Sequence, residues 1–115
     1  MAVLLNQSKQ KELISNLLVA DTFATRAKGL MGKKTMAASD AVFFPRCNWI
    51  HTFFMSMPID VVYVDKKMKV RKLQQNLKPW RWPAPVFRAH SVIEFAAGAI
   101  NKDNIEVGDT LYVGD

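Results

Sequence analysis

A histidine, His51, and a carboxylate, Asp60, stand in the most apolar stretch of this chain, HTFFMSMPIDVVYVD at residues 51–65. A buried carboxylate without a partner is costly, or it takes up a proton, so Asp60 needs hydrogen-bond donors. Two interpretations stay open. Asp60 is a structural group bonded to backbone amides or to an arginine, or it forms half of an acid–base or ligand site with His51.

A third polar group, Arg26, lies in a segment with helical spacing. Asp21 can cap a helix over residues 22–31, in which the apolar residues form one stripe and Gly32 follows as the stop. Gly29 inside this helix costs about 1 kcal/mol relative to alanine. We therefore expect another chain segment or a ligand to approach closely there, with Arg26 one turn earlier on the same side.

Positive charge concentrates in residues 66–90, which hold eight of the sixteen Lys and Arg residues of a chain with net charge +6 and contain no acid. This distribution is typical of an anion-binding face. Within the segment, Trp80 and Trp82 lie in a proline-rich loop, KPWRWPAPV. They either cover one end of the fold or form, beside Arg81, a platform for a base or a sugar. The predicted basic face is Lys67, Lys69, Arg71 and Arg81.

Length and composition favour a single soluble domain over residues 1–115. No apolar run approaches the roughly 20 residues of a membrane helix, and no secretory signal is evident. We therefore expect a cytoplasmic protein, exported only if a leader precedes this chain, with no membrane partner. The single cysteine, Cys47, is expected to be a small buried hydrophobe. The two histidines and scattered acids predict no metal, no cofactor and no assigned catalytic residue.

Four ordered motifs resemble those of the DUF192 (UPF0127) family of small bacterial and archaeal domains. They are RAKGLMG at 26–32, HTFFMSMPIDVV at 51–62, VIEFAAG at 92–98 and VGD at 107–109. The resemblance covers about residues 14–113 and implies a mostly-β single domain with a short strand at 41–46. The family has no settled activity, so no reaction is implied. Phe54 and Ser56 depart from the residues that relatives often have there, which puts the typical ligand preference in doubt.

The strand and turn signals predict a mostly β (α+β) fold. Besides the segment at 41–46, strands are expected at 12–20, 59–65, 68–77, 90–95 and 110–113. The strand after Pro58 is apolar on both faces except at Asp60, which is typical of a central strand. About six short strands and one helix predict a small, partly closed β-barrel with the helix packed across an opening.

We interpret the chain as a non-enzymatic binding module for a small anionic or sugar-like ligand. Arg26, His51 and Asp60 are expected to line one concave site, with the tryptophan loop at its rim. Alternatives are a nucleic-acid-binding or protein-assembly module and a small acid–base enzyme of unknown reaction. The predicted ligand-binding residues are Arg26, Gly29, His51, Asp60, Trp80 and Trp82.

Overall fold

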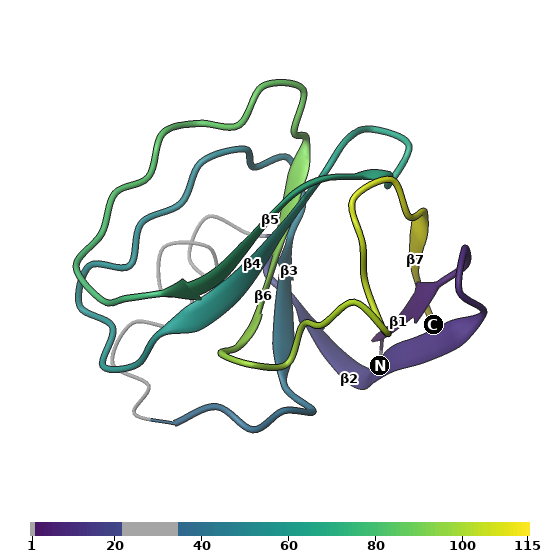
Figure 1. Cartoon of the computed structure of the whole chain (residues 1–115), viewed down its shortest axis with the longest axis horizontal. Coiled ribbons are helices and arrows are strands. Elements are labelled where there is room, and N and C mark those ends of the chain that lie inside the picture. Colours follow the sequence, from purple (N-terminus) through teal and green to yellow (C-terminus); the bar gives the residue numbers. More distant parts are fainter. Residues whose placement is uncertain (1, 22–34) are drawn as a thin grey trace.

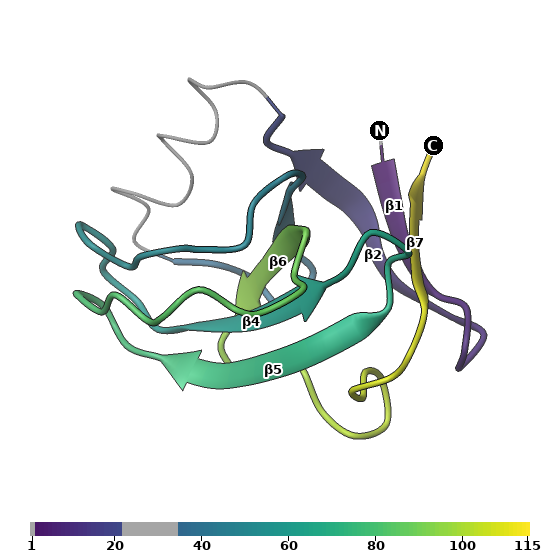
Figure 2. The ribbon, with the colours of Figure 1, turned by 90° about the horizontal axis from the view of Figure 1, so that it is seen from above.

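The computed structural model describes residues 2–21 and 35–115, which form seven strands in one sheet curled into a half-barrel (Figures 1 and 2). The strand order is β5-β4-β6-β3-β2-β1-β7. Neighbouring strands are antiparallel except β2 and β3, which run parallel. The strands are β1 (Ala2–Asn6), β2 (Lys11–Val19), β3 (Ala41–Phe44), β4 (Ile59–Val64), β5 (Val70–Leu77), β6 (Ser91–Ala96) and β7 (Leu111–Gly114).

The two edge strands of the curled sheet meet at one end. Lys69 forms an isolated antiparallel bridge with Thr110, and the Val70 amide donates to the Asp109 carbonyl oxygen at 2.8 Å. The curl places the β5 edge against the start of β7 at this point. The prediction of a mostly β fold is therefore confirmed, and the sheet curls into a half-barrel.

The two faces of the sheet support two separate hydrophobic cores. The inner core draws on all seven strands, as expected inside a curled sheet, and includes Leu4, Leu17, Phe43, Val62, Val70, Ile93 and Leu111. The outer core lies on the other face of β3, β4, β5 and β6 and is completed by the loops that follow β3 and β5. Its buried members include Phe44, Ile50, Met55, Met57, Ile59, Val61, Tyr63, Leu77 and Val92.

Strand β4 lies between β5 and β6, and all six of its residues are buried. Its alternation places Ile59, Val61 and Tyr63 in the outer core and Val62 and Val64 in the inner core. This confirms the prediction of a central strand covered on both faces. Since β6 is also buried throughout, the β4–β6 pair forms the middle of the molecule.

The count of about six strands was wrong, because β1 was not predicted. Its residues AVLLN lack the polar alternation of a half-buried strand and resemble a short apolar patch. The structure pairs β1 with β2 through a turn at residues 7–10 and with β7 on its other side. The predicted helix at 22–31, with Arg26 and Gly29, lies outside the described residues, and the described part contains no helix.

Accordingly, no helix in the described part is long and apolar enough to cross a membrane.

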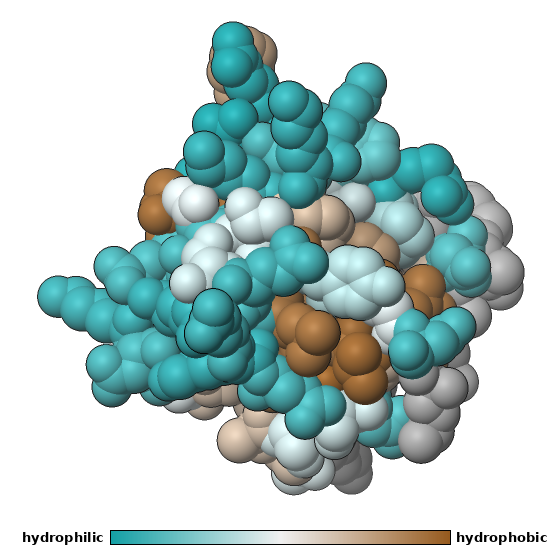
Figure 3. Space-filling view, turned by 90° about the vertical axis from the view of Figure 1, so that its right-hand side faces the viewer, coloured by the Kyte–Doolittle hydropathy of each residue, from teal (hydrophilic) through white to brown (hydrophobic). Residues whose placement is uncertain are grey.

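Figure 3 shows the side of the molecule on which β1, β2 and β7 lie. This side is mostly hydrophilic, with a hydrophobic area near the middle of the view. The loops described next lie at the opposite side of Figure 1.

Candidate functional site

Two loops run side by side over the outer core: residues 45–58, between β3 and β4, and residues 78–90, between β5 and β6 (Figures 1 and 2). Backbone hydrogen bonds join them along their length. The Cys47 amide donates to the His90 carbonyl oxygen at 2.8 Å, and the Thr52 amide donates to the Arg81 carbonyl oxygen at 2.9 Å. We call these segments the paired loops.

Thr52, which has no exposed surface, holds the tryptophan loop in place. Its hydroxyl donates to the Lys78 carbonyl oxygen at 2.7 Å and accepts from the Arg81 amide at 2.8 Å. Its carbonyl oxygen accepts from the Trp80 amide at 2.9 Å. Trp80 and Phe54 both have positive φ angles, 62° and 65°. Bulky residues rarely adopt this conformation, so the hydrogen bonds of Thr52 compensate for local backbone strain.

The paired loops carry an aromatic cluster centred on Phe53. The Phe53 ring stacks on His51 at 5.0 Å and meets the Trp82 ring edge-on at 5.7 Å. These separations are typical of favourable aromatic pairs. Much of the cluster faces solvent, since Trp80 is 57% and Trp82 61% exposed. The cluster consists of Trp49, His51, Phe53, Phe54, Trp80 and Trp82.

The cluster thus brings together three of the predicted residues, His51, Trp80 and Trp82. His51 is exposed, and its Nδ1 accepts a hydrogen bond from the Phe53 amide at 3.1 Å. The neutral tautomer that fits this bond carries its proton on Nε2, which leaves an N–H donor beside the rings. Arg81 is also exposed, and one Nη donates to the Pro79 carbonyl oxygen at 3.2 Å.

Asp60 lies apart from this cluster. Its carboxylate is completely buried and accepts hydrogen bonds from the backbone amides of Asn76, Gly98 and Ile100 at 2.8, 3.0 and 3.1 Å. Ile100 belongs to the inner core, whereas the loop of His51 covers the outer core. The prediction that Asp60 is buried and bonded is confirmed, with backbone amides as the partners. These contacts do not join it to His51.

The predicted basic face is partly neutralised by an acid just before it. Asp65 accepts hydrogen bonds from the backbone amides of Lys67 and Lys69 and from Arg71, whose Nε lies 2.8 Å from Oδ2. Partial burial raises the pKa of Asp65, but the two amides and the guanidinium outweigh it, and the pKa lies below its ordinary value. Arg71 is therefore engaged, whereas Lys67 and Lys69 remain exposed.

Two adjoining hollows separate the start of β5 from residues 84–90. One has a volume of about 470 Å³ and the other about 400 Å³, and both are lined by Arg71 and Arg88. The Arg88 guanidinium carbon lies 5.4 Å from the ring centre of Phe87, which is 84% exposed. We call this region the basic hollow.

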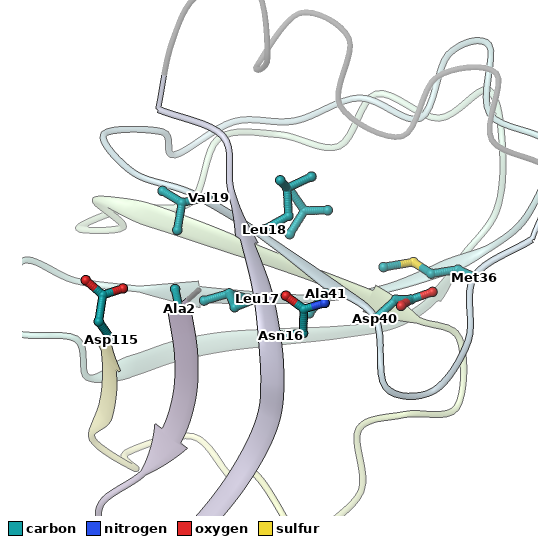
Figure 4. A pocket seen from close by; sticks show the side chains of 10 residues that line it. Ala2, Asn16, Leu17, Leu18, Val19, Met36, Asp40, Ala41 and Asp115 are labelled. Atoms are coloured by element: carbon teal, nitrogen blue, oxygen red, sulfur yellow. The ribbon is translucent and has the colours of Figure 1, made fainter.

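A further hollow of about 500 Å³ opens beside β2 and β3 (Figure 4). Its lining is mixed, with apolar groups such as Leu18 and Met36 and the acids Asp40 and Asp115. As far as the lining is described, it includes none of the predicted ligand-binding residues.

The sequence analysis missed Glu94 on β6. This residue is 4% exposed, and burial raises the pKa of its carboxyl to about 8. The neighbouring Tyr63 phenol donates to Gln74 at 3.2 Å, and its pKa is raised to about 12 by burial and then by the charges of Glu94 and Cys47. A signal was available, because VIEFAAG places an acid at the centre of an apolar strand.

Cys47 is half-buried, and its thiol donates to the Trp49 carbonyl oxygen at 3.1 Å. It packs against the outer core, which fits the small-hydrophobe interpretation in part. In residues 2–21 and 35–115, no three His, Cys, Asp or Glu side chains gather in a way that could hold a metal ion.

Comparison with known proteins identifies a family without an assigned activity. The DUF192 family, described as uncharacterised, matches residues 4–113. A UPF0127 protein of Pyrococcus horikoshii is 37% identical over 114 residues, covering 95% of this chain and 96% of its own. One from Thermococcus sibiricus is 34% identical over 113 residues, covering 95% and 73%. These relatives are archaeal.

Two solved bacterial structures share the fold. A protein of unknown function from Novosphingobium aromaticivorans has a TM-score of 0.79, with 20% identity over 96% of this chain and 82% of its own. A putative transcription regulator from Sinorhizobium meliloti has a TM-score of 0.77, with 20% identity over 97% and 91%. At this identity the likeness extends to the fold alone.

Proposed function

We propose a function from the site itself, because this chain belongs to the DUF192 family and that family is described as uncharacterised. The chain is a non-enzymatic binding module that takes an acidic sugar on the aromatic cluster of the paired loops. The observation that carries this proposal is the exposure of several large rings at one place, on a backbone that Thr52 holds fixed.

Stacking on the rings supplies the first part of the recognition. Trp82 stacks on Trp49 with ring centres 5.1 Å apart, and Phe54 packs against Trp80 at 4.9 Å. These contacts hold the rings together and leave large parts of them exposed, 61% for Phe54. A rigid apolar surface of this kind suits the flat C–H face of a sugar ring and loses little entropy on binding.

Charge and hydrogen bonding supply the second part. Arg81 separates the two tryptophans in the sequence, and its exposed guanidinium can pair with a carboxylate. Lys78 is exposed at the start of the same loop. The Nε2–H of His51 offers a donor to a sugar hydroxyl or carboxylate. Arg26, one of the predicted ligand-binding residues, lies outside the described residues, so Arg81 supplies the positive charge in the proposal.

The test is a titration with trigalacturonate, using the neutral maltotriose as the matched control and the tryptophan indole N–H signals as the readout. We expect shifts of the Trp80 and Trp82 signals with the acidic sugar and weaker ones with maltotriose. Trp80→Ala should weaken binding about tenfold, the equivalent of about 1.4 kcal/mol. Arg81→Gln should weaken trigalacturonate binding and leave maltotriose unchanged.

Phe87→Ala is the control variant, because Phe87 is an exposed ring of the same loop that contacts Arg88 rather than the cluster. It should bind trigalacturonate as the parent does. The proposal fails if trigalacturonate gives no shift at millimolar concentration, or if Trp80→Ala and Phe87→Ala have equal effects.

Nucleic acid is the second candidate, and the basic hollow favours it. Arg71 and Arg88 line both parts of this hollow, with exposed Phe87 at its edge. An oligonucleotide held there would lose affinity steeply with salt, and Phe87→Ala would then weaken binding while Trp80→Ala would not. The same pair of variants therefore distinguishes the two candidates.

A further inference from the structure

Two tight turns form the walls of the basic hollow. The turn before β5 is closed by a hydrogen bond from the Asp65 amide to the Lys69 carbonyl oxygen, at 3.0 Å. The turn at residues 86–89 is closed by a hydrogen bond of 3.1 Å between its first and last residues. The His90 amide donates to the Val64 carbonyl oxygen at 2.7 Å, which ties the second turn to the end of β4. Backbone hydrogen bonds therefore hold both walls in place.

Arg71 lines both parts of the hollow, and Asp65 orients its side chain. The Nε of Arg71 donates to Oδ2 of Asp65 at 2.8 Å, and Nη2 lies 2.8 Å from the same oxygen. This side-on contact leaves the edge formed by Nη1 and Nη2 without a partner among the described residues. Two N–H groups on one guanidinium edge match two oxygens of a phosphate. Arg71 is thus a positioned donor with one edge to spare.

Arg88 lines the same two parts and has no acidic partner in residues 2–21 and 35–115. Its φ angle of 67° is one that side chains of this size rarely adopt. Strained positions of this kind cluster at ligand sites. Because both parts of the hollow share Arg71 and Arg88, the two guanidinium groups lie where the parts meet.

The walls on either side of these two arginines differ in chemistry. On one side lie the apolar residues 84–87, with the Phe87 ring 84% exposed. On the other side lie the exposed Lys66 and Lys67, and the acid beside them, Asp65, is already ion-paired. The junction is therefore positively charged and has an open aromatic ring next to it on one side.

We propose that the basic hollow binds a small phosphate ester that carries a flat ring, of the class of the nucleoside monophosphates. The phosphate lies between the guanidinium groups of Arg71 and Arg88, and the ring stacks on the open face of Phe87. Each part of the hollow has a volume within the range of small-molecule sites, about 300–1,000 Å³.

This site goes beyond the acidic-sugar proposal, because it uses neither the aromatic cluster nor Arg81. It shares the basic hollow with the nucleic-acid candidate, but the number of phosphates separates the two. Both parts of the hollow converge on one pair of guanidinium groups, which suits a single phosphate. A nucleic-acid chain needs several cations spaced along its backbone instead.

The probe is adenosine 5′-monophosphate (AMP), titrated at low salt and about pH 7.5, where its phosphate is a dianion. The readout is the backbone amide signals of residues 86–90. Ribose 5-phosphate lacks the base and adenosine lacks the phosphate, so these two compounds are matched controls. We expect AMP to bind about tenfold more tightly than ribose 5-phosphate, because stacking of one base contributes that much. Adenosine should cause no shift at millimolar concentration.

Two variants divide the site into its parts. Arg88→Gln should weaken AMP and ribose 5-phosphate alike, by about tenfold, because both lose one guanidinium group. Phe87→Ala should weaken AMP about tenfold and leave ribose 5-phosphate unchanged. Arg81→Gln is the matched control, since it removes an exposed arginine from the acidic-sugar site and should change neither affinity.

An oligonucleotide of six deoxyadenosines with hydroxyl ends tests the nucleic-acid alternative. If it binds more tightly than AMP, the hollow takes a chain and the inference is overturned. The inference also fails if AMP causes no shift at millimolar concentration, if Arg88→Gln and Arg81→Gln weaken AMP equally, or if Phe87→Ala leaves AMP binding unchanged. None of these results depends on trigalacturonate, so this inference and the acidic-sugar proposal can fail separately.

Discussion

Asp60 and Glu94 are two buried carboxyls on neighbouring strands, and the chain treats them in opposite ways. In the β4–β6 ladder Asp60 is paired with Phe95 and Glu94 with Val61, so the two acids lie one step apart on opposite faces. Asp60 accepts three backbone amides, whereas Glu94 accepts none among the described residues.

The difference follows from where unpaired amides are available. Asp60 is near the start of β4, where the backbone around Asn76 and Gly98 leaves the regular ladder and has positive φ angles of 54° and 88°. The amides released there point at the Asp60 carboxylate. Glu94 lies in the middle of β6, where the amides of the neighbouring strands serve the ladder itself. A carboxyl in such a place has no free backbone amide from which to accept a hydrogen bond.

The largest expected effect comes from removing the satisfied carboxylate. Asp60→Ala leaves three amide donors without their acceptor, and each unsatisfied donor is costly. We expect the free energy of unfolding in urea to fall by about 2–4 kcal/mol. Asp60→Asn keeps one carbonyl oxygen and should lose less. If Asp60→Ala unfolds at the parent urea concentration, the structural role assigned to Asp60 is wrong.

The unsatisfied carboxyl of Glu94 should make the free energy of unfolding depend on pH. The pKa of Glu94 rises from 4.5 to about 8 on folding, so the folded state binds the extra proton between these values. Stability from this group is complete below pH 4.5 and is lost as pH rises towards 8. The slope approaches about 1.4 kcal/mol for each pH unit.

Glu94→Gln removes this titration, so its unfolding free energy should decline less than that of the parent between pH 5 and pH 8. The difference between the two proteins, measured by urea unfolding at several pH values, isolates Glu94 from the other acids. Parallel curves for parent and variant over this range would show that Glu94 is ionised in the folded protein and would remove the contrast with Asp60.

The contrast also shows what could be predicted from the sequence. Strand β4 and the burial of Asp60 were predictable, because an acid within a continuous apolar strand must be buried and bonded. Its actual partners were not, because the amides of Gly98 and Ile100 come from a turn 38 and 40 residues away in the chain. Sequence spacing suggested His51 instead, which is closer along the chain but is exposed and stacks on Phe53.

For the candidate site, local motifs predicted which residues were special but not how they group. The tryptophan loop and His51 come together because Thr52 hydrogen-bonds to residues 78–81, a long-range contact without a local signal. Strand β1 was missed because its strand character depends on pairing with β2 and β7. Glu94 had a visible signal, an acid inside an apolar run, that was read only as part of a motif.

The smallest effect should come from Asp65, a third carboxylate, which has both amide donors and an arginine but lies nearer the surface. Its side chain is 13% exposed and that of Arg71 40% exposed, so solvent and salt weaken their attraction. Arg71→Gln should lower the free energy of unfolding by less than about 1 kcal/mol at pH 7 and low salt. The loss should vanish in 1 M salt. Lys72→Gln, which removes a neighbouring exposed positive charge, is the control for this salt effect.

Because the pKa of Asp65 is lowered on folding, the contribution of the Asp65–Arg71 pair exists above the unfolded pKa of about 3.8 and disappears as pH falls through the lower folded value. A loss from Arg71→Gln that equals that from Asp60→Ala would mean that burial does not separate these carboxylates.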